Sequence, residues 1–111
     1  MVKRCLLALA LACAAPAPPL AAQTPEPRTF QVEIKGFAFA PAALEIHAGD
    51  IVEWTNRDFA PHSATADAGA WDSGAIRNQA SARFVAGAPG SFAYHCKFHP
   101  HMKGAITVLA P

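Results

Sequence analysis

The sequence has little charge, no apolar run long enough to cross a bilayer and no stretch with the period of a helix. Charged residues make up 15% of the 111 residues and apolar ones 52%, which excludes a disordered chain and indicates one packed domain. The formal charge is only +1 and no basic cluster is present, so nucleic acid is not expected as a partner. The composition therefore favours a small globular protein without a membrane span.

The amino terminus has the organisation of a secretory signal peptide. Lys3 and Arg4 form a basic segment, and the apolar run from Cys5 to Ala15 that follows them is too short to span a membrane. Small residues then precede a polar segment, which favours cleavage after Ala22 over cleavage after Ala17. We therefore expect a signal peptide at residues 1–22, a proline-rich linker at 23–28 and a folded domain at 29–111, exported to the periplasm.

Cysteine is scarce in the exported protein. Cys5 and Cys13 leave with the signal peptide, so Cys96 remains as the only cysteine, in a compartment where disulfides would otherwise form. The sequence before Cys13 loosely resembles a lipoprotein cleavage site, and lipidation there is the alternative to simple export. Removing Lys3 and Arg4 leaves seven basic and eight acidic residues, a formal charge of 7 − 8 = −1. A single exported thiol indicates an inert buried side chain, an intermolecular disulfide or a metal ligand.

Short segments of alternating apolar and polar residues predict a fold made of strands. In the segment 29–35, Phe30, Val32 and Ile34 alternate with polar neighbours, which is the pattern of a half-buried strand. The segment 36–39 continues the apolar character until Pro41 interrupts it, and residues 69–78 have no period, which is typical of a long connection. Further strands are expected at 43–47, 51–55, 63–66, 81–85, 92–96 and 104–109. About seven to eight short strands separated by turns predict an all-β, single-domain antiparallel β-sandwich.

The segment 94–102, YHCKFHPHM, carries the strongest chemical signal. Cys96 alternates in step with two large apolar residues of its strand, so its sulfur should point into the core where the strand ends. His99 and Met102 follow at the spacing Cys-x2-His-x2-Met, and His62 can join them because the loops of a sandwich cluster at its ends. A thiolate, two imidazoles and a thioether are the ligands of a blue-copper site, which holds both Cu(I) and Cu(II).

Each of these side chains also has a simpler interpretation. Taken singly, they fit a core thiol, surface imidazoles and a methionine that fills a gap, and only the joint spacing favours a metal site. His95 should point to the opposite face from Cys96 by strand alternation. We expect His101 to be exposed and His47 to be an ordinary strand residue. Trp54 and Trp71 are expected to pack in or around the core.

Two motifs of this sequence resemble those of the cupredoxins, the family of small blue copper proteins. One is Tyr-His-Cys-x-x-His-Pro-x-Met, which begins at Tyr94 and is followed by Gly104; the other is Trp-x-Asn-Arg-x-x-x-Pro-His, which begins at Trp54. The resemblance covers residues 29–110. It implies a Greek-key β-sandwich that binds one copper ion in a type 1 site, and the ligands that it implies are His62, Cys96, His99 and Met102.

The resemblance further implies a monomeric periplasmic carrier of single electrons, without catalysis of its own. Its partners would be a redox protein that donates the electron and another that accepts it, such as a dehydrogenase or a c-type cytochrome. Transient electron-transfer interfaces are small, so we expect docking at the apolar residues beside the two histidines: Phe59, Pro61, Phe98 and Pro100.

Three other functions compete with the carrier. A copper chaperone or storage protein is the main alternative, but methionine-rich or histidine-rich tracts suited to handing copper on are missing. A Cys–His nucleophile would need an orienting Asn or Asp at a recognisable position, and a copper oxidase would need a second copper centre. Structural zinc would not select a methionine ligand.

One position departs from the family pattern. In many cupredoxins the residue after the first ligand histidine is Asn, whose side chain ties the two ligand loops together, whereas this chain has Ser63. A hydroxyl can donate or accept a hydrogen bond but reaches less far than an amide. The resemblance therefore does not imply the same tie, nor a value for the reduction potential.

Overall fold

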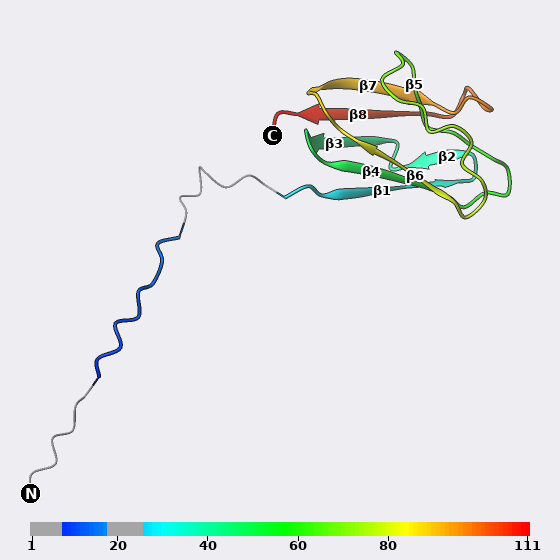
Figure 1. The fold of residues 1–111 in the computed structure, drawn as a ribbon. Coiled ribbons are helices and arrows are strands. Elements are labelled where there is room, and N and C mark those ends of the chain that lie inside the picture. Colours follow the sequence, from blue (N-terminus) through cyan, green and yellow to red (C-terminus); the bar gives the residue numbers. More distant parts are fainter. Residues whose placement is uncertain (1–7, 18–25) are drawn as a thin grey trace, which may run out of the picture.

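The structure is a computed structural model that describes residues 8–17 and 26–111 (Figure 1). Residues 8–17 form neither helix nor strand, and the rest of the predicted signal peptide and the first half of the linker, residues 23–25, lie outside the described residues. Within the described ranges no helix could cross a membrane. Eight strands are present there: β1 (Thr29–Lys35), β2 (Ala38–Ala40), β3 (Ala43–His47), β4 (Ile51–Asn56), β5 (Thr65–Ala66), β6 (Ser81–Val85), β7 (Gly90–His95) and β8 (Lys103–Leu109).

The strands form two four-stranded sheets that pack face to face as a β-sandwich (Figure 1). One sheet has the order β2-β1-β4-β6 and the other β3-β8-β7-β5. The predicted all-β sandwich is confirmed, and the predicted strand segments match the observed ones to within a few residues. Two of the pairings, β1 with β4 and β3 with β8, are parallel rather than antiparallel. Parallel neighbours require a crossover, which the intervening strands of the opposite sheet supply here.

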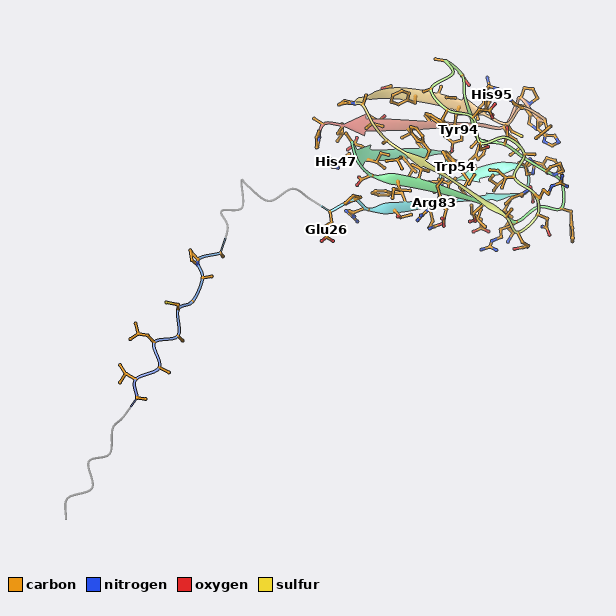
Figure 2. All side chains as sticks on the ribbon, viewed as in Figure 1. Glu26, His47, Trp54, Arg83, Tyr94 and His95 are labelled. Atoms are coloured by element: carbon orange, nitrogen blue, oxygen red, sulfur yellow. The ribbon has the colours of Figure 1, made fainter. Side chains whose placement is uncertain are left out.

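Large aromatic side chains fill the space between the sheets. Trp54 on β4 and Tyr94 on β7 are each 1% exposed, and their rings meet edge to face with centroids 5.5 Å apart (Figure 2). The indole Nε1 of Trp54 donates a hydrogen bond to the Tyr94 hydroxyl at 3.2 Å, which satisfies its buried polar atom. Trp71 lies at the edge of this core, stacked on Phe84 at 4.3 Å. The prediction of packing roles for both tryptophans is confirmed.

The segment 36–39 reverses direction instead of extending the first strand. Gly36 and Phe37 have φ angles of 60° and 58°, and they form the tight turn between the antiparallel strands β1 and β2. A left-handed conformation is rare for Phe, so only Gly36 gives a local signal for this turn. Asp58, more than twenty residues away, holds it: its two carboxylate oxygens accept hydrogen bonds from the amides of Gly36 at 2.8 Å and Phe37 at 2.9 Å.

The two ends of the sandwich are built from different turns. One end contains the β1–β2 turn, the loop after β4 and the loop between β7 and β8 (Figure 1). The two loops, but not the turn, carry the predicted metal ligands. The other end holds the start of β1, the β3–β4 turn and the carboxyl terminus. There Asp50 accepts hydrogen bonds from the amides of Arg28 at 3.0 Å and His47 at 2.9 Å.

Candidate metal centre

Cys96 is the first residue after β7 and is completely buried. Its position in the core at the strand's end is the predicted one. The loop that it opens is closed by two backbone hydrogen bonds, from the Cys96 amide to the Met102 carbonyl at 3.1 Å and from the Met102 amide to the His99 carbonyl at 2.9 Å. The loop from Cys96 to Met102 is therefore a compact turn rather than an open excursion, and Met102 is itself only 2% exposed.

His62 comes from the connection after β4, on the other side of the site. Its backbone pairs with Ile76 through two hydrogen bonds of 3.1 and 2.6 Å. Buried Asn56 organises the connection: its Nδ2 donates to the carbonyls of Ala60 and Ile76, each at 2.9 Å, and its Oδ1 accepts from the Asp58 amide at 2.8 Å. Sequence reasoning singled out Asn56 only through the family motif, because these partners are tertiary.

The orientation of the His62 ring is set by Asp58. The ring nitrogen Nε2 lies 2.9 Å from a carboxylate oxygen of Asp58, and the ring is fully buried. Burial opposes ionisation of Asp58, but hydrogen bonds from the amides of Phe37 and Gly36 and from His62 hold its pKa below the usual value. An ionised carboxylate only accepts hydrogen bonds, so Nε2 carries the proton and Nδ1 keeps its lone pair for a metal.

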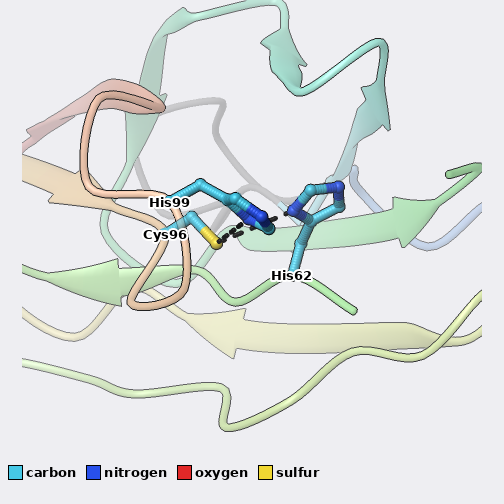
Figure 3. Close-up of side chains that lie close together, drawn as sticks. All are labelled: His62, Cys96 and His99. Atoms are coloured by element: carbon cyan, nitrogen blue, oxygen red, sulfur yellow. Dashed lines mark hydrogen bonds between the residues drawn. The ribbon is translucent and has the colours of Figure 1, made fainter. Parts of the chain in front are cut away.

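Three potential donor atoms converge at this end of the sandwich (Figure 3). The sulfur of Cys96 lies 3.7 Å from Nδ1 of His62 and 3.7 Å from Nδ1 of His99, and the three donor atoms lie within 4.8 Å of one another. Typical metal bonds of about 2.0 Å to imidazole and about 2.3 Å to thiolate, at angles between tetrahedral and trigonal, separate sulfur from nitrogen by roughly 3.5 to 3.7 Å. Both sulfur-to-nitrogen distances therefore match those around a single metal ion.

The donor set also fits copper by its chemistry. One thiolate and two imidazoles, with a buried thioether residue in the same loop, combine the soft ligands of Cu(I) with the nitrogen ligands of Cu(II). The structure brings three of the four predicted ligands, His62, Cys96 and His99, into one cluster. It places Met102 in the core, where its backbone is hydrogen-bonded to Cys96 and His99 of the same loop.

The other histidines of this end lie outside the cluster, as predicted. His95 is half-buried, and its Nδ1 pairs with Asp67 at 2.6 Å. His101 is exposed, and its ring centroid is 6.4 Å from that of His99. Neither histidine belongs to the group of donor atoms that His62, Cys96 and His99 form.

An aromatic residue that sequence reasoning missed covers the two histidines predicted to be ligands. The ring of Phe37 meets the imidazole of His62 edge-on at 5.0 Å between centroids and that of His99 at 4.9 Å. Phe37 reaches this place through its left-handed backbone conformation in the β1–β2 turn. Two further aromatic residues of this end are exposed: Phe59 at 95% and Phe98 at 49%.

Ser63 ties the two ligand segments together despite its short side chain. Its hydroxyl oxygen accepts a hydrogen bond from the amide of Lys97 at 2.8 Å, and its own amide donates to the Cys96 sulfur at 3.3 Å. Ser63, the residue after His62, is thus bonded both to Cys96 and to Lys97. The hydrogen-bonded connection between the two loops, which the resemblance did not imply for a serine, is therefore present.

The Cupredoxin-like domain family matches residues 3–108, which is nearly the whole chain. The chain belongs to the cupredoxin family. This cupredoxin is 30% identical over 82 residues to amicyanin of Paracoccus denitrificans, a match that covers 69% of the chain and 63% of that relative. It is also 30% identical over 83 residues to amicyanin-alpha of Methylorubrum extorquens, covering 70% of each protein.

Solved structures agree with the fold. A variant of amicyanin in its Cu(I) form superposes with a TM-score of 0.68 at 26% identity, covering 80% of this cupredoxin and 88% of that chain. A second amicyanin variant, in its reduced state, gives a TM-score of 0.65 at 28% identity and covers 73% and 82% of the two chains. The chain spans less than two thirds of the Paracoccus relative.

Proposed function

We propose that this cupredoxin is a blue copper protein that carries single electrons by cycling between Cu(II) and Cu(I), and that it is not an enzyme. The proposed ligands are His62, Cys96, His99 and Met102, with one copper ion per chain. The observation that carries the proposal is the convergence of the Cys96 sulfur and two imidazole Nδ1 atoms within 4.8 Å. The solved amicyanin structures described as Cu(I) forms support copper as the metal.

The residues of the chain would perform three tasks in this function. Copper, when bound, supplies the one-electron change, and the protein holds its ligands in a single arrangement so that little rearranges on transfer. His62 and Cys96 are completely buried, which keeps water away from the ligand atoms. His99 is half-buried and lies between Phe37 and exposed loop residues, so its ring offers a path from the site to the surface.

A spectroscopic experiment tests the proposed site. Cu(II) is added to the purified chain without its proposed signal peptide, residues 23–111, and visible and electron paramagnetic resonance spectra are recorded. We expect an intense blue band from sulfur-to-copper charge transfer and a narrow copper hyperfine splitting, because a thiolate in a trigonal site delocalises the unpaired electron.

The matched variants are Cys96→Ser and His101→Ala. The blue band should vanish in the first and persist in the second, since His101 lies in the same loop but outside the donor cluster. A pale spectrum that is the same with and without the Cys96 thiol would overturn the copper-carrier function. A blue protein that readily gives its copper to an apo-acceptor would instead favour the chaperone or storage alternative.

Export is part of the proposal. Residues 1–22 would be removed as a signal peptide, and residues 23–28 would link the new amino terminus to the domain that starts at β1. The mass of the protein recovered from a bacterial periplasmic extract should correspond to a chain that begins at Gln23. An uncleaved chain in the cytoplasm would contradict it.

We further propose that redox partners dock on the apolar residues around the His99 ring: Phe59, Pro61, Phe98 and Pro100. Phe59 and Phe98 expose 95% and 49% of their surface, a high value for aromatic residues. Electron self-exchange between two copies of the protein, measured by nuclear magnetic resonance line broadening, tests this surface without a known partner. Phe98→Ser should slow self-exchange several-fold, whereas Val85→Ser, at an exposed position on β6 far from the site, should not. Equal rates would rule out this surface.

A further inference from the structure

A chain of hydrogen bonds leads from the ligand loop to the protein surface. The Lys97 amide donates to the Ser63 hydroxyl at 2.8 Å, which lies 2.9 Å from the hydroxyl of Thr65. The Thr65 hydroxyl in turn donates to a carboxylate oxygen of Asp72 at 3.1 Å. The other oxygen of this carboxylate forms an ion pair with the Lys97 ammonium group. The sequence of contacts thus begins and ends at Lys97 and closes a ring.

The direction of every bond in the ring follows from the number of hydrogens available. The single hydroxyl hydrogen of Thr65 is used on Asp72, so the bond between the two hydroxyls must use the hydrogen of Ser63. All donors therefore point towards the negative charge of Asp72. A hydroxyl that donates becomes a better acceptor, so each bond strengthens the one before it.

The charge at the end of the ring is stable. The Lys97 ammonium group and the amide of Gly74 hold the pKa of Asp72 at about 2. The ion pair itself is about half exposed and contributes little energy on its own. Ser63 and Thr65, by contrast, are 0% and 8% exposed, so their hydroxyls need partners within the protein.

We propose that Thr65, Asp72 and Lys97 are positioning residues for the metal site, and that their ring fixes Ser63 so that its amide stays bonded to the Cys96 sulfur. This inference rests on the proposed copper function and adds to it residues that touch no donor atom. Ser63 is held on two sides: its amide donates to the Cys96 sulfur, and its hydroxyl accepts from the amide of Lys97. A hydrogen bond to the thiolate stabilises the more electron-rich Cu(I) state and raises the reduction potential.

The test replaces the middle of the ring. Thr65→Val has nearly the same shape but cannot accept from Ser63 or donate to Asp72, whereas Thr65→Ser keeps the hydroxyl and is the matched control. The first readout needs no copper: hydrogen exchange of the Lys97 amide in the apoprotein. We expect exchange to become at least tenfold faster in Thr65→Val and to stay within about twofold of the wild type in Thr65→Ser.

The second readout is the reduction potential of the copper-loaded protein. In Thr65→Val the ratio of reduced to oxidised protein at a fixed applied potential should fall about threefold to tenfold, which is about 30 to 60 mV for one electron. Thr65→Val leaves every formal charge in place, so a shift reports the hydrogen bonds rather than a lost ion.

The outcomes separate the ring from the proposed function. Unchanged Lys97 exchange and an unchanged potential in Thr65→Val would overturn the ring, and so would equal changes in Thr65→Val and Thr65→Ser. If the wild type lacks a blue band while Lys97 exchange still responds to Thr65→Val, the ring persists as a tie between the loops and its role in tuning copper is overturned. Faster exchange together with a lower potential in Thr65→Val alone supports the proposal.

Discussion

Each end of the sandwich is fastened by one aspartate that accepts hydrogen bonds from two backbone amides. At the end away from the site, Asp50 bonds the amides of Arg28 and His47, and at the site Asp58 bonds those of Gly36 and Phe37. Both carboxyl groups have lowered pKa values. The difference is that Asp58 also bonds the ring of His62.

The same type of aspartate–amide connection supports only the fold at one end and also the candidate metal site at the other. At Asp50 the carboxylate only connects the start of β1 with the β3–β4 turn, so its contribution is to folding. At Asp58 the same kind of connection places the Phe37 ring over both histidines and fixes the free nitrogen of His62. Replacement of either aspartate should therefore affect stability alike, but only replacement of Asp58 should affect metal binding.

The largest expected contrast between the ends concerns two glycines. A Cβ added at Gly104, beside the metal loop, would lie 2.2 Å from the Cζ atom of buried Tyr94, whereas a Cβ at Gly49 would meet nothing within 4 Å. We expect Gly104→Ala to cost about 3 kcal/mol or more, because the Tyr94 ring must leave its place against Trp54. Gly49→Ala should cost only about 1 kcal/mol, from the strain of its φ of 99°.

Urea unfolding of the apoproteins measures both glycine effects. Gly104→Ala should also disturb the blue band, since β8 begins directly after Met102. Equal losses of stability in the two variants would mean that the tight contact at Tyr94 relaxes at little cost, and that the metal end is no more closely packed than the other.

The aspartates themselves give the second contrast. Asp50→Ala and Asp58→Ala should each lower the free energy of unfolding by about 2 kcal/mol, because each leaves two backbone amides without a charged acceptor. Only Asp58→Ala should in addition shift the sulfur-to-copper band and weaken copper binding, by roughly tenfold or more, since His62 loses its orienting partner. A normal copper spectrum in Asp58→Ala would show that the orientation of His62 is set by its backbone pairing with Ile76 instead.

The smallest expected effect is the pH dependence of stability at the end away from the site. Hydrogen bonds from the amides of Arg28 and His47 lower the pKa of Asp50 below its unfolded value of about 3.9. A lowered folded pKa contributes stability that is present above the unfolded pKa and lost as the pH falls through the folded pKa. Unfolding of the apoprotein should therefore become easier from about pH 5 downwards, and Asp50→Asn should flatten this slope. A parallel slope in the variant would assign the acid sensitivity to other carboxyl groups.

Much of the fold could be predicted from local sequence patterns. Alternation in the segment 29–35 and turn residues between later segments predicted the strands, because a half-buried strand must alternate its side chains between core and solvent. The hairpin at Gly36 and Phe37 could not be predicted in this way. Its turn depends on a Phe in a conformation that local preference disfavours, and on Asp58, which lies 22 residues from Gly36 and 21 from Phe37.

The candidate site was likewise predictable in part. The spacing Cys-x2-His-x2-Met placed three predicted ligands in one loop, and the sandwich topology justified bringing His62 to them. The covering ring of Phe37 and the bonds of Ser63 to Cys96 and Lys97 were outside the reach of spacing. They join residues from separate loops, and a short hydroxyl makes a tie only if the fold brings its partner within about 3 Å.

The sequence by itself determined the chemistry of this cupredoxin: which donor atoms are present, how they are spaced in the metal loop and which strand ends at the cysteine. These properties are local, since residue type and alternation act over a few neighbours. The tertiary structure alone decided how the donors are held, through Asp58 on His62, Phe37 over both imidazoles and the ring that closes at Lys97. Hydrogen bonds depend on distances of a few tenths of an ångström between segments far apart in the chain, and only the packed sandwich fixes those distances.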